Sequence, residues 1–253
     1  MSIRVENLKH IYEKGMPTES LALDNISFEV EDGQLFGIIG HTGSGKSTLL
    51  QHLNGLLKPD EGRIHIGGVD ITEPGISMTE IRKRIGLVFQ YPEYQLFEET
   101  VAKDVVFGPK NLGLSEEEAE ERVKEALELV GLDYEIFKDR SPFDLSGGQK
   151  RRVAIAGVIA MRPEVLILDE PTAALDPIAE FEVYSRMNQM IGEKSAVFIS
   201  HRLSSCRFCH DIVVFRRGSL IQRGSHNVLV NDKSGMYYKL WNAQAQYYEV
   251  EEE

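Results

Sequence analysis

A short segment near the start of the chain has the residue types and spacing of a phosphate-binding loop. GHTGSGKST at 40–48 fits the pattern G-x-x-x-x-G-K-[ST] and lies between the apolar run LFGIIG and a helical pattern. Glycines let backbone N–H groups turn toward phosphate oxygens, and a helix N-terminus adds partial positive charge. Lys46 would reach the β- and γ-phosphates of a nucleotide, and the Ser47 hydroxyl would bind Mg²⁺. The residues expected around the phosphates are Gly40, His41, Thr42, Gly43, Ser44, Gly45, Lys46, Ser47 and Thr48.

An acidic pair farther along the chain could supply the remaining chemistry. Asp169 and Glu170 end the run VLILDE at 165–170, which reads as a buried strand. Ligands bind beyond the carboxyl ends of strands in open α/β sheets. Asp169 would hold Mg²⁺ through water, and Glu170 would act as general base for an attacking water molecule. An acidic pair can also cap a helix, but the phosphate-binding pattern favours the catalytic interpretation.

Both cysteines and two histidines fall in the segment ISHRLSSCRFCHD at 199–211. Cys206 and Cys209 make only half of a typical zinc ligand set, and no second Cys or His pair follows at the usual spacing. A helix would place the two cysteines on one face, where they would pack. We therefore interpret them as packing residues rather than metal ligands.

Composition narrows the class of protein. The chain has 253 residues, of which 42% are hydrophobic, so it can bury a large core as one domain. Its net charge of −12 disfavours nucleic acid as a partner. The start MSIRVENLKH lacks an apolar signal core, and the longest apolar run, at 153–161, is shorter than the ~20 residues that span a bilayer. We expect a cytoplasmic chain that reaches a membrane only through a partner.

The elements that must position these residues alternate between strands and helices. A capping-box pattern, Ser115 with Glu118, opens a helical region at 115–162. The apolar residues Ala119, Val123, Leu127 and Val130 share one face of that region. Strand patterns occur at 2–8, 25–33, 35–40, 85–90, 165–170 and 195–200, hairpins at 62–71 and 211–224, and a closing helix at 235–248.

The pentapeptide LSGGQ at 145–149 opens a basic helical pattern, and with it the chain resembles the nucleotide-binding domain of an ATP-binding cassette (ABC) transporter. The other motifs of that family are GHTGSGKS, the Q-loop glutamine Gln90, VLILDE, and the D-loop AALD at 173–176. The resemblance implies an α/β fold over 1–253: a P-loop NTPase (RecA-like) core, an N-terminal antiparallel β subdomain, and an inserted α-helical subdomain at about 90–160.

The same resemblance implies roles for individual residues around ATP and Mg²⁺. Tyr12 would stack on adenine, although an aromatic residue there could also simply pack. Gln90 would sense Mg²⁺ and the attacking water, and His201 would contact the γ-phosphate. The signature residues Ser146, Gly147, Gly148 and Gln149 would act on the nucleotide of a second subunit, either another copy or a paralogous ABC ATPase subunit. An integral membrane permease would hold the pair at the inner face of the cell membrane.

Within the family, two parts of the chain resemble different groups. Residues 1 to about 177 are similar to ATPase subunits of energy-coupling-factor importers, as in FQYPEYQLFEETVAKDVVFGPKNLGLS. Residues from about 178 to 253 are similar to bacterial exporter domains, and the importers' C-terminal dimerisation region is not seen. A natural or engineered chimera joined near 165–180 would explain the change; a single divergent lineage is the alternative.

Two other functions are open alternatives. A soluble cassette protein of DNA repair or translation would carry long coiled-coil insertions or two cassettes, and this sequence has neither. A chimeric cassette without a physiological transporter would fold and bind ATP, and binding to a purified permease would separate it from the leading hypothesis of a transporter ATPase.

Overall fold

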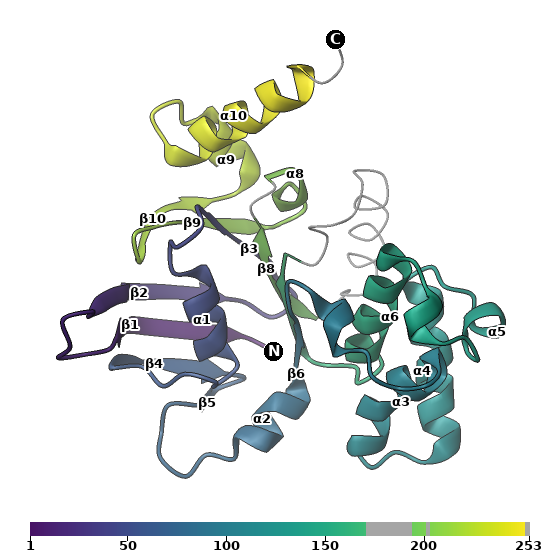
Figure 1. Ribbon diagram of the computed structural model, residues 1–253. Coiled ribbons are helices and arrows are strands. Elements are labelled where there is room, and N and C mark those ends of the chain that lie inside the picture. Colours follow the sequence, from purple (N-terminus) through teal and green to yellow (C-terminus); the bar gives the residue numbers. More distant parts are fainter. Residues whose placement is uncertain (171–193, 201–202, 251–253) are drawn as a thin grey trace. The chain divides into compact units, whose positions relative to one another are not determined.

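The computed structural model describes residues 1–170, 194–200 and 203–250 (Figure 1). The chain divides into two compact units. The first unit comprises Met1–Ile81 and Glu193–Glu253, and the second comprises Arg82–Gly192. The single-domain expectation, with a helical subdomain at about 90–160, stays a prediction.

An antiparallel sheet forms one layer of the first unit. Its strand order is β2 (Ser20–Val30), β1 (Ile3–Tyr12), β4 (Glu61–Ile66) and β5 (Val69–Asp70). Apolar side chains alternate along β1, so that Ile3, Val5 and Leu8 are buried. The predicted hairpin at 62–71 is confirmed, because β4 and β5 pair across the glycines at 67–68.

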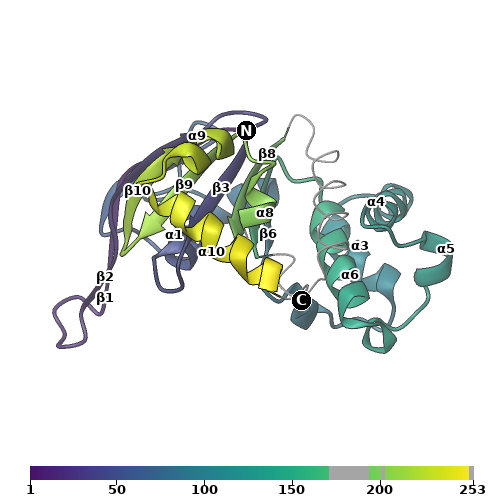
Figure 2. The ribbon, with the colours of Figure 1, turned by 90° about the horizontal axis from the view of Figure 1, so that it is seen from above.

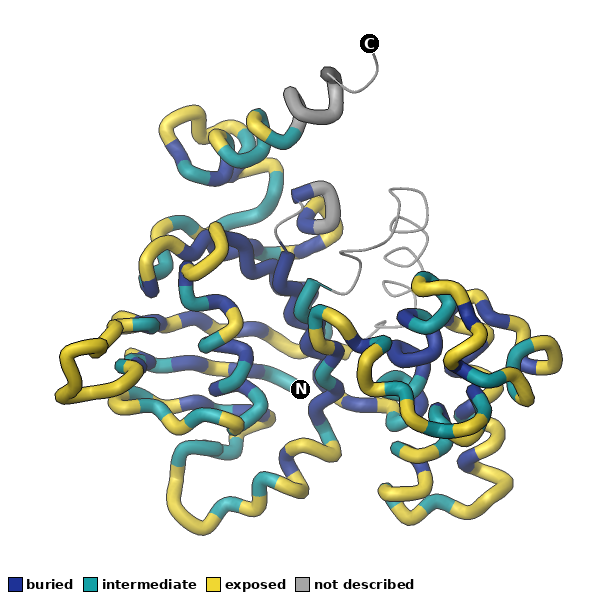
Figure 3. Tube along the Cα trace, in the orientation of Figure 1, coloured by how far each residue is buried: buried dark blue, intermediate teal, exposed yellow. Residues whose placement is uncertain are grey.

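Parallel strands form the core of the same unit. β3 (Leu35–Gly40) pairs in parallel with β8 (Ser195–Ser200) and with β9 (Asp211–Arg216), and β10 (Ser219–Gly224) pairs antiparallel to β9. Every residue of β3 and β8 is buried, and both strands are dark blue in Figure 3. Their continuous apolar sequences are typical of strands covered on both faces.

The helices of the first unit are mostly short. They are α1 (Lys46–Leu53), α8 (Leu203–Cys206), α9 (His226–Asn231) and α10 (Met236–Val250). α9 follows β10, and α10 lies beside α9 and runs back toward α8 (Figures 1 and 2). None of the helices in the part of the chain that the structure describes is long and apolar enough to cross a membrane.

The second unit joins a pair of parallel strands to a group of helices. α2 (Met78–Arg84) leads into β6 (Ile85–Val88), which pairs with β7 (Val165–Asp169). Between these strands the chain forms η1 (Pro92–Gln95), α3 (Val101–Asn111), α4 (Glu116–Leu129), α5 (Tyr134–Phe137), η2 (Pro142–Asp144) and α6 (Gly147–Ile159). α3, α4 and α6 pack against one another (Figure 2).

The predicted capping box at the start of α4 is confirmed. The Ser115 hydroxyl accepts a hydrogen bond from the Glu118 N–H, and the Glu118 carboxylate accepts one from the Ser115 N–H. The predicted apolar face, from Ala119 to Val130, is buried.

Candidate nucleotide site

The predicted phosphate-binding loop connects β3 to α1 in the first unit. β3 ends at Gly40 and α1 begins at Lys46. Gly43 and Gly45 have φ angles of 74° and 105°, in the left-handed region that favours glycine. A Cβ atom on Gly45 would also lie 2.6 Å from the backbone oxygen of Ala22. The path of this loop therefore depends on its glycines.

Two side chains of the loop are buried, and both suit an anionic ligand. Lys46 is only 8% exposed, and its Nζ donates hydrogen bonds to the carbonyls of Gly40 at 2.7 Å and His41 at 3.0 Å. The buried Ser44 hydroxyl has no hydrogen-bond partner among the described residues. A buried hydroxyl without a partner is unfavourable. The phosphate oxygens of a nucleotide would satisfy it.

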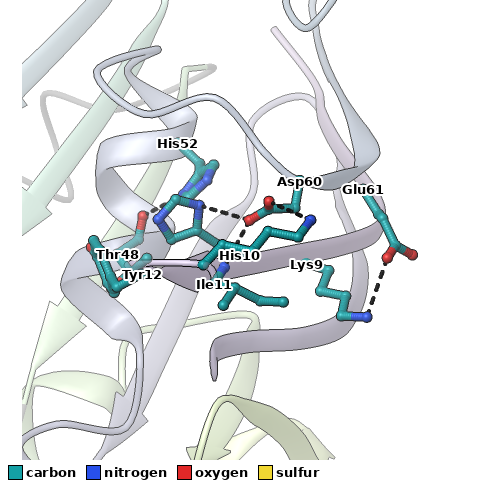
Figure 4. A network of polar contacts seen from close by, with 9 residues as sticks. Lys9, His10, Ile11, Tyr12, Thr48, His52, Asp60 and Glu61 are labelled. Atoms are coloured by element: carbon teal, nitrogen blue, oxygen red, sulfur yellow. Dashed lines mark hydrogen bonds and ion pairs between the residues drawn. The ribbon is translucent and has the colours of Figure 1, made fainter. Parts of the chain in front are cut away.

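Tyr12, the predicted adenine-stacking residue, lies next to this loop. It ends β1, its side chain is 38% exposed, and its hydroxyl lies 3.2 Å from Thr48 Oγ1 in the first turn of α1 (Figure 4). The structure therefore brings Tyr12 and the loop helix together. Stacking on adenine stays a prediction.

In the second unit, Gln90 and Glu170 lie in direct contact. Nε2 of Gln90 donates a hydrogen bond to Oε2 of Glu170 at 2.9 Å. The contact follows from strand register. Val88 of β6 pairs with Leu168 of β7, and Gln90 and Glu170 each lie two residues beyond that pair. Asp169 is the last residue of β7 and is half-buried. The two carboxylates follow each other at the strand end, as the sequence predicts.

Arg151 of α6 forms hydrogen bonds to the backbone of both residues of this pair. It is 1% exposed, and its Nη2 donates to the backbone carbonyls of Gln90 and of Glu170, the latter at 3.1 Å. Glu170 itself has a φ angle of 47°. A left-handed conformation costs a non-glycine residue about 1–2 kcal/mol. Such strain is concentrated at functional sites, which supports a functional role for Glu170.

The signature segment forms the start of α6. The Ser146 hydroxyl accepts from the Gln149 N–H at 3.3 Å, and Gln149 Oε1 accepts from the Ser146 N–H at 3.0 Å, a second capping box. Ser146 and Gly147 are exposed at the positive end of this helix. The Ser146 O–H can still be donated to an anionic oxygen. Gln149 also caps this helix, and its predicted part in nucleotide binding stays a prediction.

The remaining predictions concern His201, the D-loop and the two cysteines. His201 and the D-loop at 173–176 lie outside the described residues. Cys206 and Cys209 are both buried, as expected of packing residues, but their placement on one helical face is wrong. α8 ends at Cys206, and Cys209 lies beyond it, in the turn that leads to β9.

Sequence reasoning missed Arg151, which the structure brings to the predicted catalytic pair. Nothing in the sequence indicated its contact with the Gln90 and Glu170 carbonyls. Ser44 was among the predicted loop residues, but nothing in the sequence indicated that its hydroxyl is buried without a partner among the described residues. The Ser146 capping box could have been predicted, because Ser-x-x-Gln before a helical pattern is its signal.

A phosphate-binding loop between a buried parallel strand and a helix, together with an exposed signature segment at a helix start, defines a P-loop ATPase cassette. Comparison with known families agrees. Residues 23–173 match the family model described as ABC transporter. The chain belongs to the ABC transporter family, as an ATP-binding cassette.

Relatives within the family carry energy-coupling factor names. The chain is 59% identical over 223 residues to the energy-coupling factor transporter ATP-binding protein EcfA2 of Clostridioides difficile, covering 87% of this chain and 77% of that protein. It is 53% identical over 235 residues to EcfA2 of Clostridium tetani, covering 92% and 82%. Matches of this extent continue on both sides of residues 165–180 and give the predicted chimera no support.

Solved structures confirm the predicted fold class. One is cbiO1 from Clostridium perfringens, part of the ABC transporter complex cbiONQ, with a TM-score of 0.82 and 38% identity over 91% of each chain. Another is a bacterial Atm1-family ABC exporter with ATP bound, with a TM-score of 0.84 and 30% identity over 96% of this chain and 42% of the exporter chain.

Proposed function

We propose that this chain is the ATP-hydrolysing subunit of an energy-coupling factor type ABC transporter and drives a separate integral membrane permease. The observation that carries the proposal is the loop at 40–48, in which buried Lys46 and the partnerless Ser44 hydroxyl fit polyphosphate oxygens. The names of the EcfA2 relatives point to the same type of transporter.

The predicted site residues would have separate roles in binding ATP. The backbone N–H groups of 40–48, the Lys46 ammonium and the Ser44 hydroxyl would hold the phosphates, and Tyr12 would stack on adenine. Gln90, Asp169 and Glu170 would act at the γ-phosphate. The oxygen donors Ser47, Gln90 and Asp169 fit Mg²⁺, which prefers hydroxyl, amide and carboxylate ligands. When bound, Mg²⁺ would neutralise charge on the β- and γ-phosphates.

Glu170 would be the general base of hydrolysis. As a water oxygen forms its bond to the γ-phosphorus, the bond from that phosphorus to the β-bridging oxygen breaks, and ADP leaves with inorganic phosphate. The water proton passes to the Glu170 carboxylate. Gln90, which contacts that carboxylate at 2.9 Å, would hold its orientation. His201, which lies outside the described residues, would contact the γ-phosphate.

A second ABC ATPase subunit would complete each site. Ser146, Gly147 and Gly148 are at the exposed start of α6, where their donors could reach a nucleotide held by another subunit. Phosphoryl transfer needs charge-stabilising donors on several sides of the γ-phosphate. The pair would lie at the cytoplasmic face of the membrane, bound to the permease.

The experiment is light scattering on Glu170→Gln with and without Mg-ATP, because slowed hydrolysis should accumulate the closed pair. We expect an ATP-dependent dimer. Lys46→Ala in the same background is the matched control and should stay monomeric, since it weakens phosphate binding. A Glu170→Gln chain that binds ATP but stays monomeric would contradict a homodimer and indicate a different second subunit. A wild-type chain without ATP binding would refute the function itself.

A further inference from the structure

Tyr12 and three neighbouring residues of the first unit form a closed circuit of contacts, which we call the histidine bracket: Tyr12, His10, His52 and Thr48 (Figure 4). The His10 ring stands edge-on to the Tyr12 ring, at 4.6 Å between centroids and 87° between planes. It meets the His52 ring at 4.6 Å and 72°. Thr48 closes the circuit through the Tyr12 hydroxyl, 3.2 Å from Thr48 Oγ1.

His52 ties the bracket to the helix that follows the phosphate-binding loop. Its Nδ1 lies 2.7 Å from the Thr48 carbonyl oxygen. A carbonyl only accepts hydrogen bonds, so Nδ1 carries the proton and donates. The fully buried His52 ring is thereby fixed on α1, in the turn after Thr48. His10 therefore packs between Tyr12 and a ring that is attached to the helix following the phosphate-binding loop.

Asp60 binds residues on both sides of Tyr12, the backbone of Ile11 and the side chain of Lys14. Its Oδ2 accepts the Ile11 N–H at 2.8 Å, and its Oδ1 accepts from Lys14 Nζ at 3.1 Å. These hydrogen bonds lower the pKa of Asp60, with the Ile11 bond the largest cause, so the carboxylate stays ionised. Beyond Tyr12 the chain is exposed from Glu13 to Ser20. The bracket and Asp60, together with the pairing of Tyr12 with Ser20 between β1 and β2, determine where the Tyr12 ring lies.

His10 takes part in this arrangement through aromatic contacts of its imidazole and not through hydrogen bonds. Neither of its nitrogens has a hydrogen-bond partner among the described residues, and Nδ1 lies 3.7 Å from Asp60 Oδ2. The residue is nevertheless buried, and its two ring contacts have the edge-to-face geometry that stabilises aromatic pairs.

We propose that His10 is a positioning residue for the nucleotide base: it holds the Tyr12 ring at a set angle to α1, so that the base and the phosphates are bound in register. The proposal deepens the function given above and rests on base stacking by Tyr12. It concerns the affinity for the base-bearing nucleotide and leaves the affinity for the phosphate chain unchanged.

The experiment compares ATP with inorganic tripolyphosphate, which has no base, by titration calorimetry on the full chain with Mg²⁺. His10→Gln removes the ring and should weaken ATP binding roughly 3- to 10-fold, the loss expected for one aromatic contact. Tripolyphosphate binding should not change. His10→Phe keeps a ring without nitrogens and should bind ATP like the wild type. Tyr12→Ala should lose roughly 10-fold or more for ATP alone, and adding His10→Gln to it should cost nothing further.

Any other result would contradict either base stacking by Tyr12 or its positioning by His10. If Tyr12→Ala weakens both ligands equally or neither, base stacking fails and the bracket proposal fails with it. If Tyr12→Ala is selective for ATP but His10→Gln is silent, only the bracket proposal fails. Equal weakening of both ligands by His10→Gln, or an additive double variant, would show that His10 supports the loop in general. A His10→Phe chain as weak as His10→Gln would make the nitrogens essential, against the proposal.

Discussion

Nε2 of Gln90 donates a hydrogen bond to Oε2 of Glu170 at 2.9 Å, across the ends of two parallel strands. The Q-loop glutamine and the predicted general base are therefore one unit. Their backbone carbonyls share a further connection, since both accept hydrogen bonds from Arg151. We therefore expect a substitution at any of these residues to affect the Glu170 carboxylate more than it affects nucleotide binding.

Gln90→Glu should move the pH dependence of ATP hydrolysis. Two carboxylates at hydrogen-bond distance cannot both ionise easily, so the pKa of one rises. The acid limb of the kcat–pH profile should then shift upward by about 1 pH unit or more. Gln90→Ala should lower kcat without this shift. Profiles with the same acid limb in both variants would contradict the contact between the two side chains during turnover.

Arg151→Lys should damage catalysis more than nucleotide binding. One guanidinium nitrogen, Nη2, donates to both carbonyls, and the shorter lysine side chain would not bring its ammonium to the same point. We expect kcat to fall about 10-fold or more, with the KM for ATP nearly unchanged, because phosphates are held elsewhere. Arg152→Lys, at the next position of α6, is the control. A normal kcat for Arg151→Lys in steady-state assays would rule out this positioning role.

Gly45→Ala should destabilise the phosphate-binding loop more than Gly43→Ala does. Both positions have positive φ, but only at Gly45 would the new Cβ meet a backbone atom, the Ala22 oxygen at 2.6 Å. We expect Gly43→Ala to lower the free energy of unfolding by about 1–2 kcal/mol, from its φ alone, and Gly45→Ala to lower it further.

Urea denaturation measures these differences, and Gly113→Ala supplies the control. Gly113 has a φ of 81° with nothing near its would-be Cβ, and it lies far along the chain from the loop. Gly113→Ala should match Gly43→Ala in stability while keeping full ATP affinity. If Gly43→Ala and Gly45→Ala lower the free energy of unfolding equally, the backbone around Gly45 must shift to accommodate the new Cβ.

The two capping boxes allow stability to be separated from function. Ser115→Ala and Ser146→Ala should each cost about 1 kcal/mol of unfolding free energy, since each removes the same cap from a helix. Only Ser146→Ala should also lower ATP hydrolysis. Measuring both quantities on both variants tests the signature segment. Equal ATP hydrolysis by the two variants would show that Ser146 only caps the helix and has no direct role in the reaction.

Stability should fall with acid because of His52. Burial lowers the pKa of His52, so the ring is neutral in the folded chain, while the unfolded chain takes up a proton below about pH 6.5. The free energy of unfolding should therefore decrease as the pH drops from 7 through 6.5 toward the lowered pKa. The facing groups are His10, whose charge would lower that pKa further, and Asp60, which opposes it.

Urea midpoints at pH 7.5, 6.5 and 5.5 would measure this effect. His52→Gln should flatten the slope. Part of the slope should persist in His52→Gln, because burial also lowers the pKa of His226. An unchanged slope in His52→Gln would mean that His52 is not the group responsible.

The sequence alone determined the local parts of this protein. The loop at 40–48, the carboxylates at a strand end, the cap at Ser115 and the signature at 145–149 depend on neighbours within a few residues. Backbone conformation and helix capping act over that range, so a pattern in the chain is enough to predict them. The family, and with it the fold class, followed from the same short motifs.

The tertiary structure decided which distant residues meet. Gln90 contacts Glu170 because Val88 pairs with Leu168, and Asp60 reaches the backbone beside Tyr12 because Lys9 pairs with Glu61. Strand register is set by many weak packing interactions summed over whole elements, and a shift of one residue would turn every side chain to the other face. No short motif encodes that sum, so the support of Glu170 by Arg151 and of Tyr12 by the histidine bracket emerged only from the folded chain.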